Sequence, residues 1–253
     1  MMLLGLKEGV VYGPVHSRRL GRSLGVNILP SAIKVCTFDC LYCQYGWTGA
    51  HGARPGEGVA FPAAGAVIEA VKNALVLIDT PPAYITLSGN GEPTLHPDFP
   101  RIVDGIIETR DRFSPASQTA ILSNSTEADT EAARGALSRL DARIMKLDSG
   151  TEQVMRRFNQ PCEGVRFDRI VEGLARLGDV TIQALFTGGE AGNADVDTVG
   201  SWVECVERIA PGLVQIYTLD RDYPSRRIAP LSKAELLGIS ARLDARGIRA
   251  CVF

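Results

Sequence analysis

The chain has 253 residues, of which 45% are hydrophobic and 22% charged, and its formal net charge at pH 7 is −2. This length suits one α/β domain or a small pair, and it is enough to bury a core. The small net charge gives no global basic field of the kind that marks nucleic-acid-binding proteins. Because no apolar run approaches the length of a membrane span, and residues 1–6 are too short for a signal peptide, we expect a cytoplasmic protein with no membrane partner.

Short apolar segments alternate with amphipathic helical patterns from about residue 24 onward. The expected strands are Leu24–Leu29, Tyr84–Leu87, Thr119–Leu122, Arg143–Leu147, Val180–Leu185, Val214–Thr218 and Ile248–Val252. Helical periodicity falls near residues 63–78, 97–111, 127–139, 165–177, 195–210 and 232–245. Repeated strand–helix units imply a parallel sheet with right-handed crossovers. The pattern therefore predicts an α/β fold, either a partial barrel or an open doubly wound sheet.

No internal repeat, low-complexity tract or linker divides the chain. We expect one domain over residues 1–253, with an N-terminal extension (1–23), a barrel core (24–218) and a C-terminal helix and strand (219–253). A single domain of this size is within the ordinary range for α/β barrels.

Three cysteines lie close together in the stretch CTFDCLYC, directly after the first expected strand. Cys36, Cys40 and Cys43 have the spacing Cys-x3-Cys-x2-Cys. A reducing cytosol keeps thiols reduced, so we do not expect these cysteines to form disulfides. Sulfur ligands this close together select zinc or an iron–sulfur cluster. Zinc would need a fourth ligand, for which His51 is the nearest candidate. A cluster with three protein ligands would leave one iron open for chemistry, so the spacing favours iron–sulfur over a non-redox zinc module.

Polar residues follow the next three expected strands at their carboxyl ends, where ligands bind in parallel α/β folds. A glycine-rich turn, GNGEP, occupies residues 89–93. Ser123 and Asn124 end the following strand, and Lys146 and Asp148 end the one after it. These residues are candidate ligand contacts. Structural alternatives are a helix N-cap at Ser125 or Thr126 and an ion pair of Lys146 with Asp148 or with Glu92.

Two glutamines, Gln183 and Gln215, lie in the middle of otherwise apolar strands. Unpaired buried amides are costly, so the pair predicts a polar barrel interior rather than a purely hydrophobic one. Tyr217 shares the face of Gln215 because side chains alternate along a strand.

Arginines provide a second set of candidates. Arg221 follows the sixth expected strand, where it could bind a carboxylate or phosphate or pair with a neighbouring aspartate. Arg18, Arg19 and Arg22 precede the first expected strand in a segment rich in small residues, which suggests an anion-contacting loop. The remaining cysteines, Cys162, Cys205 and Cys251, are too widely separated to give a ligand signature, and for Cys205, on an apolar helical face, we expect core packing.

The cysteine spacing, with Tyr42 directly before the last cysteine, resembles the signature of radical S-adenosylmethionine (SAM) enzymes. This resemblance implies a partial (βα)6-type TIM-like barrel, with parallel strands inside and helices outside. It also implies a [4Fe–4S] cluster held by Cys36, Cys40 and Cys43, with the amino and carboxylate groups of SAM on the fourth iron. An electron from a flavodoxin- or ferredoxin-type donor would cleave SAM, and the resulting 5′-deoxyadenosyl radical would abstract hydrogen from a substrate. The expected enzyme is of oxidoreductase or transferase type.

The resemblance also assigns the other candidates. In this family a Gly-Gly-Glu-Pro turn receives the SAM amino group; here Asn90 separates Gly89 from Gly91, so the turn departs slightly from that pattern. The implied cofactor contacts are Tyr42, Gly89, Asn90, Gly91, Glu92, Pro93, Ser123, Asn124, Asp148 and Gln183. The implied substrate-side candidates are Lys146, Gln215, Tyr217, Arg221, Arg18 and Arg19.

Over residues 10–235 the chain also resembles the subgroup related to wyosine-type tRNA base synthases. Those enzymes carry three further cysteines upstream of the main motif for a second cluster, whereas this chain has none before Cys36. The substrate therefore stays open among a small molecule, a tRNA and a partner protein, the last as for the compact activases of glycyl-radical enzymes.

Overall fold

The main sheet of the computed structural model, which describes residues 3–52 and 58–253, has eight strands in the order β1-β2-β5-β6-β7-β8-β10-β12. Their bounds are β1 Val11–Ser17, β2 Gly21–Val26, β5 Tyr84–Leu87, β6 Gln118–Ser123, β7 Ala142–Lys146, β8 Thr181–Leu185, β10 Leu213–Tyr217 and β12 Ala250–Val252. Neighbouring strands from β2 to β12 are parallel, and β1 alone pairs antiparallel, with β2.

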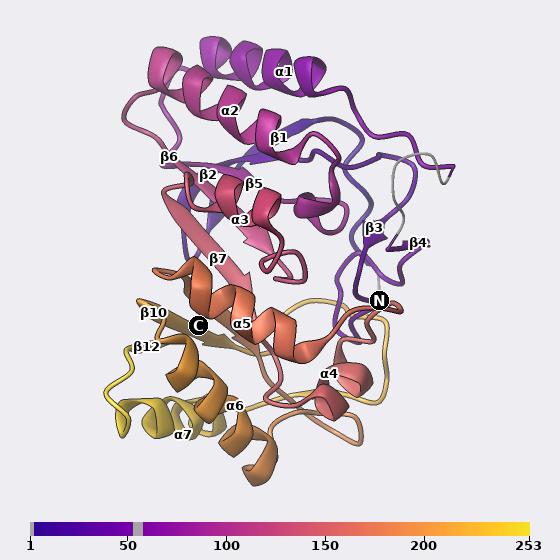
Figure 1. The fold of residues 1–253 in the computed structure, drawn as a ribbon, viewed down its shortest axis with the longest axis vertical. Coiled ribbons are helices and arrows are strands. Elements are labelled where there is room, and N and C mark those ends of the chain that lie inside the picture. Colours follow the sequence, from indigo (N-terminus) through magenta and orange to yellow (C-terminus); the bar gives the residue numbers. More distant parts are fainter. Residues whose placement is uncertain (1–2, 53–57) are drawn as a thin grey trace.

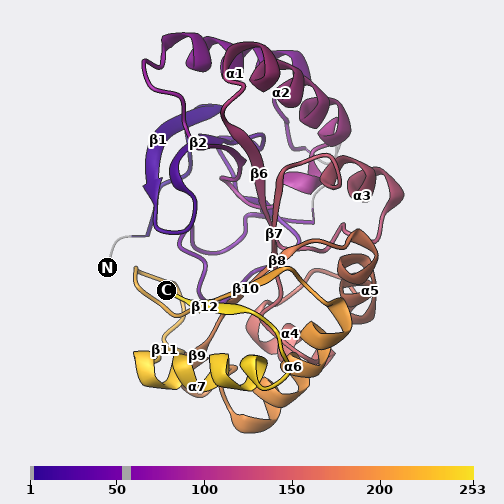
Figure 2. The same ribbon diagram turned by 90° about the vertical axis from the view of Figure 1, so that its left-hand side faces the viewer.

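Helices cover one face of this sheet and follow its curvature. They are α1 Ala64–Leu77, α2 Phe99–Phe113, α3 Glu131–Leu137, α4 Glu152–Phe158, α5 Phe167–Leu177, α6 Val196–Ile209 and α7 Lys233–Asp244, with a short 3-10 helix η1 at Pro93–Leu95. Figure 2 shows α1, α2, α3, α5, α6 and α7 as an arc outside the sheet, and within the described residues the sheet edges β1 and β12 are not paired with each other. The predicted α/β partial barrel is confirmed; it is open rather than closed.

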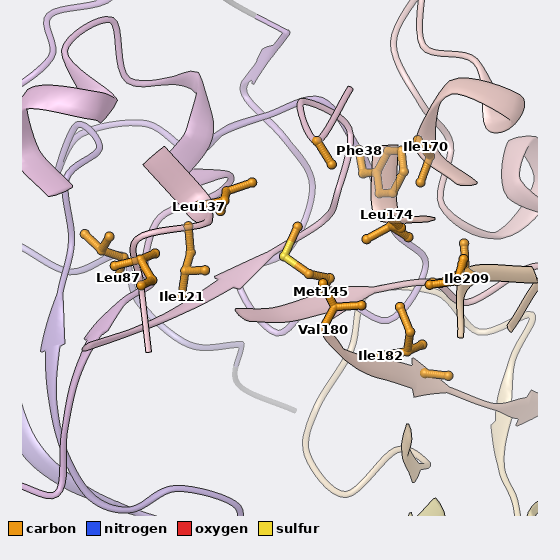
Figure 3. Packing of buried hydrophobic residues seen from close by; sticks show 14 of the residues in the cluster. Phe38, Leu87, Ile121, Leu137, Met145, Ile170, Leu174, Val180, Ile182 and Ile209 are labelled. Carbon is orange, nitrogen blue, oxygen red and sulfur yellow. The ribbon is translucent and has the colours of Figure 1, made fainter. Parts of the chain in front are cut away.

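The hydrophobic core lies between the sheet and this arc of helices. Alternate strand residues such as Leu87, Ile121, Met145 and Ile182 point outward and are at most 1% exposed. They pack against helix residues such as Leu137 and Leu174 (Figure 3). Because side chains alternate, the other set of strand residues faces the concave interior of the sheet, and that set contains Gln183 and Gln215.

Each of the seven expected strands and six expected helices corresponds to an observed element, with small shifts at the ends. The β1–β2 hairpin was not anticipated as part of the sheet, because Gly13 and Pro14 interrupt the alternation in Val11–Ser17. Residues 11–23, expected as an extension, pair within the main sheet through this hairpin.

Two short strand pairs lie outside the main sheet: β3 (Val35–Cys36) with β4 (Ala50–His51), and β9 (Thr187–Gly188) with β11 (Ala229–Pro230). In Figure 1 the β3–β4 pair lies on the right, on the side toward which the carboxyl end of β7 points. Within the described residues, no helix is both long and apolar enough to cross a membrane.

Candidate active site

The cysteine loop is anchored to the glycine-rich turn by backbone hydrogen bonds. Val35 N donates to Asn90 O at 3.0 Å, and Glu92 N donates to Val35 O at 2.9 Å. At the other end of the loop, Cys43 N donates to Cys40 O at 3.1 Å, a turn that keeps these two cysteines together. The sequence motif therefore starts from a fixed point at the carboxyl ends of β2 and β5.

Two of the three sulfur atoms, those of Cys36 and Cys40, each lie near the side-chain amide nitrogen of an asparagine. Asn124 Nδ2 lies 3.5 Å from Cys36 Sγ, and Asn159 Nδ2 lies 3.4 Å from Cys40 Sγ. Burial is the largest cause that raises the pKa of both thiols, that of Cys40 to about 12. Free thiolates are therefore disfavoured here, whereas coordination to a metal centre would hold the sulfurs deprotonated.

Lys34 supplies a buried cation beside the cysteines. Its side chain donates from Nζ to Gly46 O at 2.8 Å and interacts electrostatically with all three thiols. Sulfur atoms with N–H donors and a nearby cation fit an anionic thiolate-bound cluster. Among the residues that the structure describes, no three His, Cys, Asp or Glu side chains form a group that could share one metal ion, whereas the thiolates of an iron–sulfur cluster each bind a different iron. His51, the candidate zinc ligand, has its Nε2 3.2 Å from Thr37 O.

The glycine-rich turn depends on a glycine at position 91. Gly91 has φ +135°, and a Cβ added there would lie 1.7 Å from Val35 O. Asn90, which interrupts the expected Gly-Gly pair, is fully buried. Its side chain accepts from Lys7 N at 2.7 Å and donates to Lys7 O and Pro30 O, each at 2.9 Å. The Asn90 side chain thus ties the turn to the N-terminal segment, while its backbone carbonyl ties it to the cysteine loop.

Glu92 links the turn to the end of β6. Its carboxylate accepts hydrogen bonds from Thr94 N (3.0 Å), Ser123 Oγ (2.9 Å) and Asn124 N (2.5 Å). Burial, the largest cause, raises the pKa of Glu92, and these hydrogen bonds oppose that rise. Three of the predicted residues, Glu92, Ser123 and Asn124, therefore form one hydrogen-bonded unit next to Cys36.

Asp148 is the centre of a second unit on the other side of the cysteine loop. Its carboxylate is bonded by Lys146 Nζ at 2.7 Å, by Asn159 Nδ2 at 2.9 Å and by Leu185 N at 2.8 Å, and Tyr42 donates its hydroxyl to it. The predicted Lys146–Asp148 ion pair is present. Tyr42 also packs on Phe158, with ring centroids 5.2 Å apart.

Lys146 extends this unit into the barrel interior. Its Nζ donates to Tyr217 OH at 2.9 Å and lies over the rings of Tyr42 and Tyr217, 5.0 and 4.8 Å from their centroids. Burial by itself would lower the pKa of Lys146, but Asp148 and Tyr217 outweigh it, so the pKa is raised and the amine is held protonated. A cation fixed between two rings and a carboxylate is well placed to orient a ligand rather than to act as a base.

The two glutamines confirm the predicted polar interior. Tyr217 OH donates to Gln183 Oε1 at 3.3 Å, and Gln183 Nε2 donates to Gln215 Oε1 at 3.1 Å. Lys146, Gln183 and Gln215 are opposite one another in the strand register. They form a continuous polar row across β7, β8 and β10.

Three of the four predicted arginines gather where the turn of the β1–β2 hairpin meets the residues that follow β10, whereas Arg22 donates to Thr80 O instead. Arg18 forms an ion pair with Asp220, and the Arg19 guanidinium carbon lies 4.1 Å from the centroid of the Tyr217 ring. Arg221 Nη1 is 3.5 Å from Gln44 Oε1, in the cysteine-loop segment. The substrate-side candidates therefore lie together, although they come from both ends of the chain.

Sequence analysis missed Asn159, which contacts both Asp148 and Cys40. It caps the short helix α4 at its C-terminal end, and an asparagine there reads as an ordinary helix stop. The network leaves a cavity of about 10 Å³ between Asn124, Lys146 and Asp148, enough for one water molecule. A larger pocket of about 400 Å³ lies apart from it, beside Arg157 and β9.

Comparison with known proteins decides the family. The family model described as the Radical SAM superfamily matches residues 31–190, more than half of the chain. The chain belongs to the radical SAM superfamily. This confirms the predicted family and, with it, the [4Fe–4S] cluster and SAM as the cofactors that such enzymes use; the reaction also needs a reductant.

Curated relatives of this radical SAM protein include UPF0026 proteins. One from Synechocystis sp. is 32% identical over 223 residues, 86% of this chain and 78% of the relative. Another, from Helicobacter pylori strain 26695, is 32% identical over 238 residues, 91% of this chain and 72% of the relative.

Solved structures share the fold at low sequence identity. A radical SAM methyltransferase from Sphaerobacter thermophilus has a TM-score of 0.66 at 14% identity, covering 91% of this chain and 65% of that one. Streptococcus suis SuiB bound to S-adenosylmethionine gives 0.64 at 14%, covering 90% and 50%. TYW1 with a lysine–pyruvate adduct bound gives 0.64 at 18%, covering 88% and 73%. This chain spans about two thirds of the Sphaerobacter protein and half of SuiB. At these sequence identities the likeness concerns the fold alone.

Proposed function

We propose that Cys36, Cys40 and Cys43 of this radical SAM protein hold its [4Fe–4S] cluster and leave the fourth iron to SAM. The observation that carries the proposal is the backbone pairing of the cysteine loop with residues 90–92, which fixes the thiols beside the turn expected to receive the SAM amino group. The donors of Asn124 and Asn159 on two of the sulfurs support an anionic cluster. Family membership favours this cluster over the zinc alternative.

The chain's own residues position the cofactor. The unit of Glu92, Ser123 and Asn124 keeps the turn at residues 89–93 open to the amino group, with Gly89, Gly91 and Pro93 shaping its backbone. Asp148 fixes Tyr42 for packing against adenine, and Gln183 continues the polar wall. When bound, the cluster supplies the electron that cleaves SAM to methionine and a 5′-deoxyadenosyl radical. A flavodoxin- or ferredoxin-type protein is the proposed donor of that electron.

The substrate is proposed to lie at the polar row and the arginines, because these groups line the interior without belonging to the cysteine loop. The candidate contacts are Lys146, Gln215, Tyr217, Arg221, Arg18 and Arg19. A small molecule, a tRNA and a partner protein all remain candidate substrates. The resemblance of residues 10–235 to wyosine-type tRNA base synthases supports the tRNA candidate, whereas the net charge of −2 and the lack of cysteines before Cys36 weigh against it.

The test is anaerobic purification followed by iron analysis and a SAM-cleavage assay. The wild-type protein is expected to contain about four irons per chain and to convert SAM to 5′-deoxyadenosine under reductant. Cys40→Ala should lose both properties, and His51→Ala should keep them. A colourless wild-type protein that binds one zinc ion and never cleaves SAM contradicts the proposal.

The substrate class is tested separately, by RNA recovery from anaerobic cell extract with Cys40→Ala protein as the control. Enrichment of tRNA on the wild-type protein favours the tRNA candidate. No enrichment favours a small molecule or a partner protein.

A further inference from the structure

The Arg19 side chain is a half-buried cation without a hydrogen-bond acceptor. Arginine has five N–H donors in a fixed planar fork, yet within the described residues the Arg19 guanidinium donates to no acceptor, and its Nε is fully buried. Its backbone N–H, by contrast, donates to Ser17 Oγ at 3.2 Å. Burying a charged donor without a partner is costly, so the position calls for an acceptor from outside the chain.

Aromatic rings fix the orientation of this guanidinium. Its carbon lies 4.1 Å from the ring centroid of Tyr217 and 5.3 Å from that of Phe253. A ring as close as that of Tyr217 favours stacking against the face of the guanidinium plane, whose N–H donors point outward within that plane. Stacking therefore pre-orients the fork while leaving its edges able to bind a planar or tetrahedral oxyanion.

The turn that carries Arg19 is itself fixed. Ser17 Oγ accepts from both Arg19 N, at 3.2 Å, and Leu20 N, at 3.1 Å, closing a hydroxyl-stabilised turn at the tip of the β1–β2 hairpin. The arginine stem thus starts from a defined backbone position, which reduces the entropy lost when the fork binds an anion.

Charges around Arg19 are not balanced. In the described part of the chain, two further cations, Arg18 and Arg221, and one carboxylate, Asp220, act on it electrostatically. Arg18 already pairs with Asp220. Burial is the main cause that lowers the pKa of Arg19, and its cationic neighbours add to that effect. An anion would relieve the repulsion among these three arginines.

The Arg19 site adjoins the polar row of the barrel interior. Tyr217, on whose ring Arg19 stacks, accepts a hydrogen bond from Lys146 Nζ at 2.9 Å. An oxyanion on the Arg19 fork would therefore lie beside Tyr217, whose hydroxyl is bonded to both Lys146 and Gln183 of this row.

We propose that Arg19, stacked on Tyr217, binds an oxyanion of the substrate, a carboxylate or a phosphate group. This inference rests on the proposed function, because it places the anion at the substrate side of the radical SAM barrel. It adds that the substrate is anionic, and that the hairpin turn rather than the cysteine loop selects it.

The test is isothermal titration calorimetry on the anaerobically prepared holoprotein with SAM and without reductant. The probes are sodium malonate, inorganic phosphate and, as the uncharged analogue of malonate, malonamide. Wild-type protein should bind at least one of the anions saturably and should not bind malonamide. Malonate binding alone identifies a carboxylate substrate group, and phosphate binding alone a phosphate group.

Variants at Arg19 distinguish the contribution of its planar fork of N–H donors to anion binding from that of its positive charge. Arg19→Gln should weaken anion binding by about tenfold or more, the effect of losing charge-assisted hydrogen bonds. Arg19→Lys, which keeps the charge but not the planar fork, should weaken it less. Arg246→Gln is the matched control, because Arg246 pairs with Glu207 on the outer surface and its loss changes the net charge equally.

Two results overturn the inference: wild-type protein that binds neither anion, and Arg19 variants that bind as tightly as wild type. If Arg19→Gln does not fold, the comparison of Arg19→Lys with wild type decides. Because no reductant is present, the binding result does not depend on SAM cleavage. A protein that binds anions but never cleaves SAM contradicts the proposed function instead.

Discussion

The cysteine side and the arginine side of the barrel are built in opposite ways. On the cysteine side, buried polar groups such as Asn90, Glu92 and Asp148 have protein partners. On the arginine side, Arg19 is held by aromatic contacts and has free donors. Polar groups that already have hydrogen-bond partners can receive the same cofactor repeatedly without rearrangement. Donors without a partner, in contrast, mark a place where a ligand supplies the acceptor. We therefore expect the cysteine side to be fixed and the arginine side to select the ligand.

The largest expected effect comes from breaking the cysteine side at Gly91. In Gly91→Ala the new methyl group would overlap Val35 O, so we expect a loss of roughly 3 kcal/mol or more in the free energy of unfolding, and poor iron retention. Anaerobic thermal unfolding and iron analysis measure both.

Gly164→Ala is the matched control for this change, because Gly164 also has a positive φ but no atom within 4 Å of the added Cβ. It should cost only about 1 kcal/mol. Equal losses in the two variants would show that the close approach to Val35 is unimportant.

The next effect concerns the ion pair that joins the two sides. Lys146→Met leaves the Asp148 carboxylate, 1% exposed as a side chain, without its cation. Removing one partner of a buried pair costs about 3–5 kcal/mol, and we expect the lower end because Tyr42, Asn159 and Leu185 N still bind the carboxylate.

The double variant Lys146→Met with Asp148→Asn should recover part of this loss. Thermal unfolding of the two single variants and the double variant completes the cycle. Strict additivity would show that the two residues are not energetically coupled.

A smaller effect tests the arginine side. Ser17→Ala removes the hydroxyl that closes the hairpin turn, at a cost of about 1 kcal/mol in stability. Because Arg19 is then less well positioned, malonate or phosphate binding should weaken by several-fold, measured by the same calorimetry. Ser138→Ala, which removes an exposed hydroxyl bonded to Gly135 O, should change neither anion affinity nor SAM cleavage.

The smallest effect is a pH dependence on the cysteine side, at His96. Its Nε2 donates to Pro62 O at 2.8 Å, its Nδ1 accepts from Asp98 N at 3.0 Å, and burial lowers its pKa. Below about pH 6.5 the unfolded chain therefore binds a proton that the folded one does not, so stability falls as the pH drops from there toward the lowered pKa.

His96→Asn keeps an acceptor for Asp98 N and removes the titrating ring. The melting temperature of the wild type should fall more than that of the variant between pH 7.5 and 5.5. Parallel pH profiles for the two proteins would contradict this assignment.

Local patterns were enough to predict which residues lie together on the cysteine side. The spacing of Cys36, Cys40 and Cys43, the turn at residues 89–93 and the Lys146–Asp148 pair each lie within a few positions in the sequence. Strand alternation likewise predicted the polar interior at Gln183 and Gln215, because it depends only on the period of the strand.

Contacts between distant segments could not be predicted in this way. Arg19 reaches Tyr217 because the curved sheet brings its first hairpin close to the end of β10, and no local periodicity encodes that curvature. For the same reason, the hydrogen bonds of the Asn90 side chain to Lys7 and Pro30 could not be predicted from the sequence. The place of Asn90 in a glycine-rich turn suggested a ligand contact, whereas the N-terminal segment that uses its amide was not visible in the pattern.

Because the sheet is open, the arginine side of the barrel is held partly by exposed charges, whose attraction depends on ionic strength. Across the part of the chain that the structure describes, no strand pairing joins the hairpin to the segment after β10. One contact that bridges them is the Arg18–Asp220 pair, whose side chains are 63% and 40% exposed. Exposed charges are screened over about 10 Å in 0.1 M salt and about 3 Å in 1 M salt. Concentrated salt should therefore loosen the arginine side of the barrel, while the buried hydrogen bonds around the cysteines stay as they are.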